Sequence, residues 1–278
     1  ESIFPNSKIL SRGNKIVIKG NNSETIKIQK LIQSLIKKYE IYGSINEDDI
    51  NSLHKNGKIN NEKKLLYYGS KGKRINALSK NQNKFVDSCA FNDIVFVIGP
   101  AGTGKTFLSV VLAIKALKEK IIEKIVITRP VVEAGENLGF LPGDLQDKIN
   151  PYLRPIYDSL EEILPKKKIK QFIDNGIIEI VPLAYMRGRT LKNSYILLDE
   201  AQNTISSQIK MFLTRMGKNS KMIITGDITQ IDLKSKKESG LVDAVKRFNN
   251  TKGIKIVQLK DQDVLRHKLV KKILSKYN

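Results

Sequence analysis

Short apolar runs, rich in β-branched residues, recur through the last two thirds of the chain. They lie at 94–98, 125–128, 177–181, 195–198, 222–225 and 254–259, and patterns typical of helices separate most of them. Continuous apolar strands that alternate with helices are typical of a parallel sheet with helices on both faces. The pattern therefore predicts an α/β domain over residues 81–278.

The first 60 residues follow a different pattern. Polar and apolar residues alternate at 15–19, as in a short strand, and apolar residues then repeat every three or four positions, as in a helix that begins near Ser23. Acidic residues at 47–49 begin a second short helix, where they suit the helix dipole better than a metal site. The sequence predicts a small α/β unit at 1–60, which is a candidate RNA-binding unit, and a basic linker or arm at 61–80.

Composition excludes several classes of protein. An apolar fraction of 40% in 278 residues supports a buried core, and no stretch is long and apolar enough for a transmembrane helix. A single cysteine, Cys89, excludes an internal disulfide and a zinc site built from thiolates. Because a lone thiol suits a reducing compartment and residues 1–20 lack the apolar run of a signal peptide, we expect a cytoplasmic protein without a membrane partner.

The chain is strongly basic, with a formal net charge of +21. Such a charge suits a polyanion such as RNA or single-stranded nucleic acid, on which tyrosines such as Tyr67 and Tyr68 would stack. A second explanation stays open, because Lys, Asn and Ile have AT-rich codons and a biased genome would produce the same excess. Arginine is scarce, and lysine cannot replace its planar, forked guanidinium. Arginines inside motifs are therefore candidates for function.

The sequence GPAGTGKT at 99–106 matches the P-loop pattern G-x-x-x-x-G-K-[ST]. An apolar run precedes it and a helical pattern follows it, which is the context that the pattern requires. Backbone N–H groups of the loop would hold phosphates, Lys105 would reach the β- and γ-phosphates, and Thr106 would bind Mg²⁺. The residues expected to bind the nucleotide are Gly99, Pro100, Ala101, Gly102, Thr103, Gly104, Lys105, Thr106 and Phe107.

Two further apolar runs end in polar residues. The run at 195–198 leads into Asp199, expected to hold the metal, and Glu200, expected to orient or deprotonate the attacking water. The run at 222–225 leads into Gly-Asp, and Gln230 follows as a candidate sensor of the γ-phosphate. A helix cap and a strand-to-turn junction are the structural alternatives. Adjacent parallel strands end at one edge of a sheet, so we expect one site that hydrolyses a phosphoanhydride bond.

The order GPAGTGKT, LLDEAQ, GDITQ resembles superfamily 1 and 2 helicase-like motors, and more closely the PhoH-like family of bacterial P-loop ATPases. The resemblance covers about 81–277 and implies a RecA/helicase-like P-loop NTPase fold. Ala201 departs from the family pattern, in which Ser is also common after the acids. The most specific stretches are TRP at 128–130, EAGE at 133–136, LGFLPGDL at 138–145, DKINPYLRPIYD at 147–158, AYMRGRTL at 184–191, QIKMFLTR at 208–215 and DVLRH at 263–267.

The resemblance also implies roles outside the P-loop. Asn81 and Gln82 match the position that reads adenine, with ordinary surface polarity as the alternative. Arg266 is the first candidate for an arginine finger, with Arg187 and Arg189 as rivals or as contacts for nucleic acid. Six arginines lie inside family-like stretches: Arg129, Arg154, Arg187, Arg189, Arg215 and Arg266.

These observations favour an ATPase that uses ATP and Mg²⁺ and is coupled to RNA or single-stranded nucleic acid, with RNA helicase activity as one form of that coupling. The chain has room for one motor domain, so a neighbouring copy would supply the missing side of the site. A homo-oligomer follows, and the resemblance suggests a hexamer. Two alternatives stay open: a nucleotide-switched adaptor for an RNA-processing nuclease or a ribosome-associated partner, and a P-loop kinase of a small molecule.

Overall fold

A computed structural model of the chain describes residues 4–13, 15–42, 45, 50, 64–130, 145–233, 239–265 and 269–270. The chain divides into two compact units, residues 1–64 and 65–278. The second short helix expected at 46–49 lies outside the described residues, as do the last residues of the chain.

The smaller unit contains a hairpin and a long helix. Strands β1 (Lys8–Arg12) and β2 (Lys15–Lys19) pair antiparallel, and helix α1 (Asn22–Tyr42) follows. The Asn21 side chain accepts a hydrogen bond of 2.9 Å from the N–H of Glu24 near the start of this helix. The strand and the helix expected from sequence are both present, and β1 completes the hairpin.

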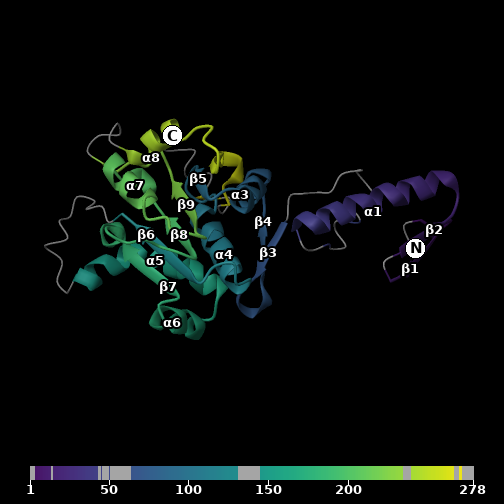
Figure 1. The fold of residues 1–278 in the computed structure, drawn as a ribbon, viewed down its shortest axis with the longest axis horizontal. Helices are drawn as coiled ribbons and strands as arrows, with labels where there is room; N and C mark the ends of the chain where they lie inside the picture. Colours follow the sequence, from purple (N-terminus) through teal and green to yellow (C-terminus); the bar gives the residue numbers. More distant parts are fainter. Residues whose placement is uncertain are drawn as a thin grey trace. The chain divides into compact units, whose positions relative to one another are not determined.

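The larger unit is built on a six-stranded sheet (Figure 1). Every pair of neighbouring strands in it is parallel. All six apolar runs that were expected to form strands do so, which confirms the α/β fold class. In spatial order the strands are β10 (Ile254–Gln258), β5 (Ile94–Ile98), β9 (Lys221–Gly226), β8 (Ser194–Leu198), β6 (Lys124–Arg129) and β7 (Ile178–Pro182).

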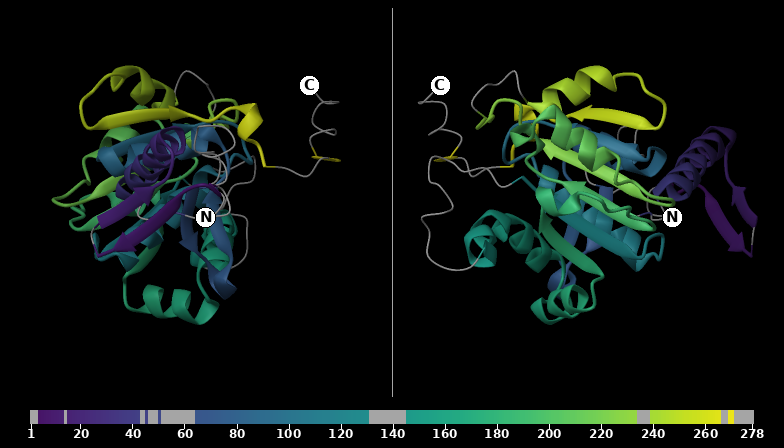
Figure 2. Two further views of the ribbon diagram at one scale, coloured as in Figure 1. Left: turned by 90° about the vertical axis from the view of Figure 1, so that its right-hand side faces the viewer. Right: turned by 60° about the vertical axis from the view of Figure 1, so that its left-hand side comes forward.

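Helices cover both faces of this sheet (Figure 2). Side chains alternate between the faces along each strand: in β5, Val95 and Val97 join one buried cluster and Phe96 joins the other. The first cluster contains side chains of α3 (Lys80–Phe91), α4 (Lys105–Lys118), α5 (Leu145–Ile163) and α6 (Lys166–Asp174). The second contains side chains of α7 (Ser206–Leu213) and α8 (Gly240–Arg247).

The basic linker expected at 61–80 is not a linker over most of its length. Strands β3 (Lys64–Tyr68) and β4 (Arg74–Ala77) pair with each other there, and α3 already begins at Lys80. Leu66, Ile75 and Ala77 are buried in the first cluster. The many lysines and glycines around these apolar residues obscure the strand pattern in the sequence. Residues distant in sequence stabilise the strands. Lys73, for example, forms an ion pair of 3.2 Å with Glu162 at the end of α5.

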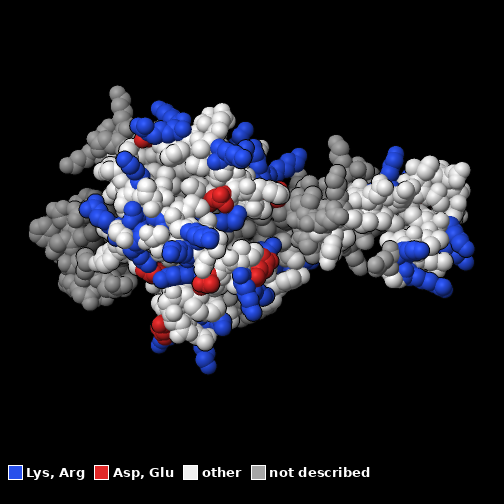
Figure 3. Space-filling model, viewed as in Figure 1, with Lys and Arg blue, Asp and Glu red and all other residues white. Residues whose placement is uncertain are grey.

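Basic side chains are spread over the visible surface of the larger unit, with fewer acidic ones among them (Figure 3). They do not gather at one place on this face, so both explanations of the net charge remain open. None of the helices in the described part of the chain combines the length and the apolar character that a membrane span needs.

Candidate active site

The P-loop connects β5 to α4 at the carboxyl edge of the sheet. Gly102 and Gly104 have φ angles of 81° and 80°, a left-handed conformation that glycine adopts without a steric cost. A Cβ on Gly99 would lie 2.7 Å from the carbonyl oxygen of Leu259, so only glycine permits this close approach to the end of β10. The loop is therefore held tightly between β5, β10 and the first turn of α4.

Lys105, the first residue of α4, folds back over this loop. Its Nζ donates hydrogen bonds to the carbonyl oxygens of Gly99 at 2.7 Å and Pro100 at 3.0 Å. These carbonyls hold the ammonium group above the loop, where a bound phosphate would lie. The structure thus places the Lys105 ammonium group over the backbone of the P-loop.

A buried carboxylate at the end of β8 meets two hydroxyl groups. The Oδ1 atom of Asp199 accepts hydrogen bonds from Thr106 at 2.7 Å and from Thr225, on β9, at 2.6 Å. Carboxylate and hydroxyl oxygens are the hard ligands that Mg²⁺ prefers, and this ion takes few ligands from the protein besides phosphate oxygens and water. Thr106 and Asp199, which the structure brings within hydrogen-bond distance of each other, therefore fit such a metal. Thr225 was missed, although a threonine stands out in an otherwise apolar strand.

Glu200 follows Asp199 and has a left-handed backbone, with φ at 54°. For a residue other than glycine this conformation costs about 1 kcal/mol or more, and such strain clusters at functional sites. Its Oε2 accepts a hydrogen bond of 2.5 Å from the Gln202 side chain, and its Oε1 lies 3.3 Å from Nη2 of Arg129. Neither partner was assigned this role from sequence, and the contact with Arg129 depends on β6 lying beside β8.

Gln202 links Glu200 to the end of β9. It is buried, and its Oε1 accepts a hydrogen bond of 3.0 Å from the N–H of Asp227. The Asp227 carboxylate in turn accepts one of 3.1 Å from the P-loop N–H of Ala101. Gln230, the expected sensor, is exposed in the turn that follows, where its N–H donates to the carbonyl of Asp227. We call Lys105, Thr106, Asp199, Glu200, Gln202 and Asp227 the central site.

Gln82 is not a surface residue, since only 1% of it is exposed. Its Oε1 accepts a hydrogen bond of 2.6 Å from the N–H of Leu78, and its Nε2 donates one of 3.0 Å to the P-loop carbonyl of Thr103. Asn81 instead donates to the Asp263 carboxylate at 2.8 Å. The structure brings Gln82 to the nucleotide loop, while its amide is engaged by the backbone on both sides.

The motif arginines separate into anchored and exposed side chains. Arg189 makes two hydrogen bonds, of 2.6 and 2.8 Å, to Glu179 on β7, and Arg215 donates to the carbonyls of Met211 and Arg189. The bonds from Arg189, helped by Lys124 and opposed by burial, lower the pKa of Glu179 to about 2. Arg187 is exposed and has no side-chain partner among the described residues. Arg266, the candidate finger, lies outside the described residues.

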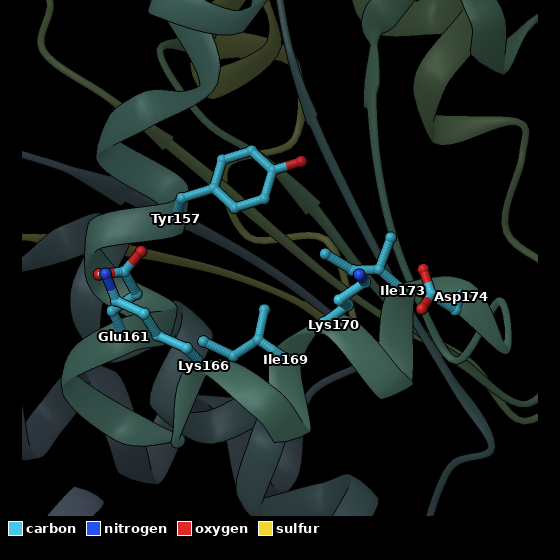
Figure 4. A pocket seen from close by; sticks show the side chains of 7 residues that line it. All are labelled: Tyr157, Glu161, Lys166, Ile169, Lys170, Ile173 and Asp174. Atoms are coloured by element: carbon cyan, nitrogen blue, oxygen red, sulfur yellow. The ribbon is translucent and has the colours of Figure 1, made fainter.

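A groove of about 220 Å³ opens between α5 and α6 (Figure 4). Charged side chains border an apolar floor, and none of the central-site residues lines it. Its lining residues are Tyr157, Glu161, Lys166, Ile169, Lys170, Ile173 and Asp174.

Comparison with known sequences gives consistent matches. A family model described as "PhoH-like protein" matches residues 74–278. A PhoH-like protein of Bacillus subtilis (strain 168) is 47% identical over 283 residues, which cover 98% of this chain and 88% of that protein. One of Synechocystis sp. is 42% identical, with coverage of 98% and 85%. Protein PhoH of Escherichia coli (strain K12) is 42% identical, with coverage of 73% and 58%.

Comparison with solved structures gives more distant matches. The large terminase of a thermophilic bacteriophage has a TM-score of 0.44 at 12% identity, over 72% of this chain and 50% of that one. The SWI2/SNF2 ATPase core of Sulfolobus solfataricus, in complex with double-stranded DNA, has a TM-score of 0.41 at 14% identity, over 67% and 45%. The chain thus matches about half the length of these structures.

Proposed function

The chain belongs to the family of PhoH-like proteins, and from this premise we propose that it is a Mg²⁺-dependent ATPase coupled to RNA or single-stranded nucleic acid. One observation carries the proposal. A P-loop, a pair of oxygens suited to a metal and a glutamate suited to water meet at the ends of three neighbouring strands, β5, β9 and β8. The reaction transfers the γ-phosphoryl group of ATP to water, giving ADP and phosphate.

The groups with which the P-loop would hold the phosphates form hydrogen bonds to other parts of the protein in the structure described. Lys105 exchanges the carbonyls of Gly99 and Pro100 for phosphate oxygens, which are stronger acceptors for an ammonium group. The N–H of Ala101, bonded here to Asp227, is a further donor for which a phosphate competes. Nucleotide binding is therefore expected to loosen the contact between the P-loop and the end of β9.

Thr106 and Asp199 hold the metal through their oxygens, and the metal, when bound, neutralises charge on the phosphates. Glu200 orients the attacking water by accepting a hydrogen bond from it and takes its proton as the bond to phosphorus forms. This step requires the Glu200 carboxylate to turn toward the nucleotide. The hydrogen bond from Gln202 to its Oε2 positions the carboxylate for this step.

Three further roles rest on the family resemblance. Gln82 and Asn81 read the adenine or hold the loop beneath it. Gln230 senses the γ-phosphate from its exposed turn. Arg266 of a neighbouring copy acts as the arginine finger, so the chain works as a homo-oligomer, for which the resemblance suggests a hexamer. We place this activity in the cytoplasm, where a lone thiol stays reduced.

The loop after β7, residues 183–190, supports a nucleic-acid partner. We call it the β7 loop. Tyr185 is 55% exposed on it, close in sequence to the exposed Arg187, while Leu183 and Met186 are buried beneath. An exposed aromatic ring stacks on a base and an exposed guanidinium binds phosphate. Because β7 runs parallel to the other strands and lies four positions from β5, the β7 loop is at the same edge of the sheet, about 19 Å from the P-loop.

The test is ATP turnover by the purified chain, with and without single-stranded RNA. We expect turnover that rises with RNA. Glu200→Gln removes the carboxylate at nearly constant shape and is expected to lower kcat by about 10²–10⁴ while ATP still binds. Glu119→Gln, which changes an acid in a surface pair with Lys115, is the matched control and should leave kcat unchanged.

Other outcomes would contradict the proposal in distinct ways. Tight ATP binding with negligible turnover in both conditions would favour the adaptor that recruits a nuclease or a ribosome-associated partner. Transfer of the phosphoryl group to an added small molecule, with none to water, would favour the kinase. Turnover that RNA does not change would remove the nucleic-acid coupling and leave the ATPase.

A further inference from the structure

We propose that Arg129 is a positioning residue that holds Glu200 away from the nucleotide and so restrains ATP turnover when no nucleic acid is bound. The inference rests on the proposed function, because it assumes that Glu200 acts on water. It concerns the regulation of that step and a residue to which the sequence assigned no such role.

The contact follows from the order of the strands. Arg129 is the last residue of β6, which lies beside β8, and Thr128 pairs with Leu198 in their register. The N–H of Asp199 donates to the carbonyl of Thr128 at 2.9 Å. The two strands thus end level with each other, and the side chains of Arg129 and Glu200 meet where they end.

The guanidinium of Arg129 joins two separate parts of the protein. Its Nη2 lies 3.3 Å from Oε1 of Glu200, and its Nη1 donates a hydrogen bond of 2.9 Å to the carbonyl oxygen of Tyr152 on α5. Only 20% of the Arg129 side chain and 34% of the Glu200 side chain are exposed, so solvent screens this pair less than a surface pair. Lysine has no planar fork with which to hold both partners in these directions.

This arrangement aims the Glu200 carboxylate at the protein. One oxygen faces Arg129 and the other accepts from Gln202. A carboxylate that orients a water must approach it within hydrogen-bond distance, about 2.6–3.2 Å, from a suitable side. Turning toward a water on the nucleotide side separates one carboxylate oxygen from its present partner. The contact with Arg129 is the longer, and it connects Glu200 to β6 and, through Tyr152, to α5, whereas Gln202 connects Glu200 to the end of β9.

Through β6, this contact also reaches the candidate surface for nucleic acid. The register partner of Arg129 on its other side is Pro182, the residue just before the β7 loop. A ligand that moves the β7 loop or α5 thus acts directly on the strand end or on the carbonyl that holds Arg129. Withdrawal of Arg129 would release Glu200, which gives a physical route from the bound polymer to the water-activating residue.

The experiment compares Arg129→Met and Arg129→Lys with the unchanged chain, measuring kcat and KM for ATP with and without single-stranded RNA. In Arg129→Met we expect kcat without RNA to rise about threefold to tenfold, with KM unchanged and little further stimulation by RNA. Arg129→Lys retains the charge but not both bonds, so its kcat without RNA should lie between that of the unchanged chain and that of Arg129→Met. Arg247→Met is the matched control: it also removes an arginine, on α8, whose exposed ion pair is with Asp243 and which lies in none of the family-like stretches.

The outcomes separate this inference from the function on which it rests. An unchanged chain that binds ATP without turnover overturns both. A chain that turns over ATP, but whose kcat falls or stays the same in Arg129→Met, overturns the restraint alone. If Arg129→Met does not fold, Arg129→Lys decides: raised basal kcat with weaker RNA stimulation supports the restraint, and unchanged values overturn it.

Discussion

The central site and the β7 loop lie at the same edge of one sheet but are built in opposite ways. In the central site, polar side chains are buried and bonded to one another, as Asp199 is to Thr106 and Gln202 is to the backbone of Asp227. In the β7 loop, apolar side chains are buried while Tyr185 and Arg187 face solvent.

The difference reflects the ligand that each region suits. Buried polar groups are costly unless they are bonded, so a network of them holds one geometry, as a small ligand with fixed charges requires. An exposed ring and an exposed guanidinium impose little geometry of their own, and they suit a flexible polymer that presents many equivalent bases and phosphates. Changes in the first region should therefore affect stability and turnover together, whereas changes at the exposed side chains of the second should affect binding alone.

Of the changes that compare these two regions, Gln202→Ala is expected to have the largest effect. The change removes the acceptor of the buried N–H of Asp227 and the donor to Glu200. An unsatisfied buried group costs about 1–3 kcal/mol of unfolding free energy, and loss of the positioning bond should lower kcat by about tenfold or more. Urea unfolding and ATP turnover measure the two effects.

A matched glutamine tests whether burial is the reason. Gln208 is exposed, and its side chain also accepts a hydrogen bond from a backbone N–H, that of Ile205, at 3.0 Å. Gln208→Ala should cost less stability and leave kcat unchanged. Equal losses from the two changes would contradict the distinction between the central site and the surface.

A smaller effect, confined to binding, is expected from Tyr185→Ala. Loss of one stacking ring should weaken single-stranded RNA binding by about fivefold to a hundredfold, since stacking contributes about 1–3 kcal/mol per base. Turnover without RNA and the unfolding free energy should not change, because 55% of the residue is exposed. Fluorescence anisotropy with labelled RNA measures the affinity.

Tyr68 provides the control, because its exposed fraction of 56% matches that of Tyr185 and it was itself a candidate for stacking. It lies on β3, outside the carboxyl edge of the main sheet. Tyr68→Ala should leave the affinity unchanged. A larger loss from Tyr68→Ala than from Tyr185→Ala would move the interface away from the β7 loop.

The strands of the main sheet were predictable because each contains a run of mostly apolar residues. The hairpin of β3 and β4 was not, because its buried residues, Leu66, Ile75 and Ala77, are scattered among lysines and glycines. Its burial depends on packing in the first cluster, with side chains of α3, α4 and α5. A local sequence pattern predicts a strand whose own residues are mostly apolar. It fails for a strand whose burial depends on residues that are distant in sequence.

The same limit of local sequence patterns separates the site residues that were predicted from the contacts that were not. Lys105, Thr106 and Asp199 were named because fixed spacing within a motif determines where they lie. The contacts of Thr225 with Asp199 and of Arg129 with Glu200 depend on β8 lying between β9 and β6. The order of parallel strands is set by packing of the whole domain, which no single segment encodes. Likewise, only the structure separates the anchored Arg189 from the exposed Arg187.

The smallest effect concerns the ion pair beneath the β7 loop and its dependence on pH. Glu179 has a pKa of about 2, first because of its hydrogen bonds to Arg189, so the pair stabilises the fold fully above the ordinary pKa of 4.5 and loses that contribution as pH falls toward 2. Arg189→Met should therefore lower stability by about 1–2 kcal/mol near pH 7, a value discounted for partial exposure, and by almost nothing at pH 2. Urea unfolding at several pH values measures this difference. Arg247→Met, which removes an exposed pair with Asp243 on α8, should change the pH profile much less, because solvent screens that pair. A loss from Arg189→Met that is the same at every pH would mean that Arg189 contributes packing and no charge pairing to the base of the loop.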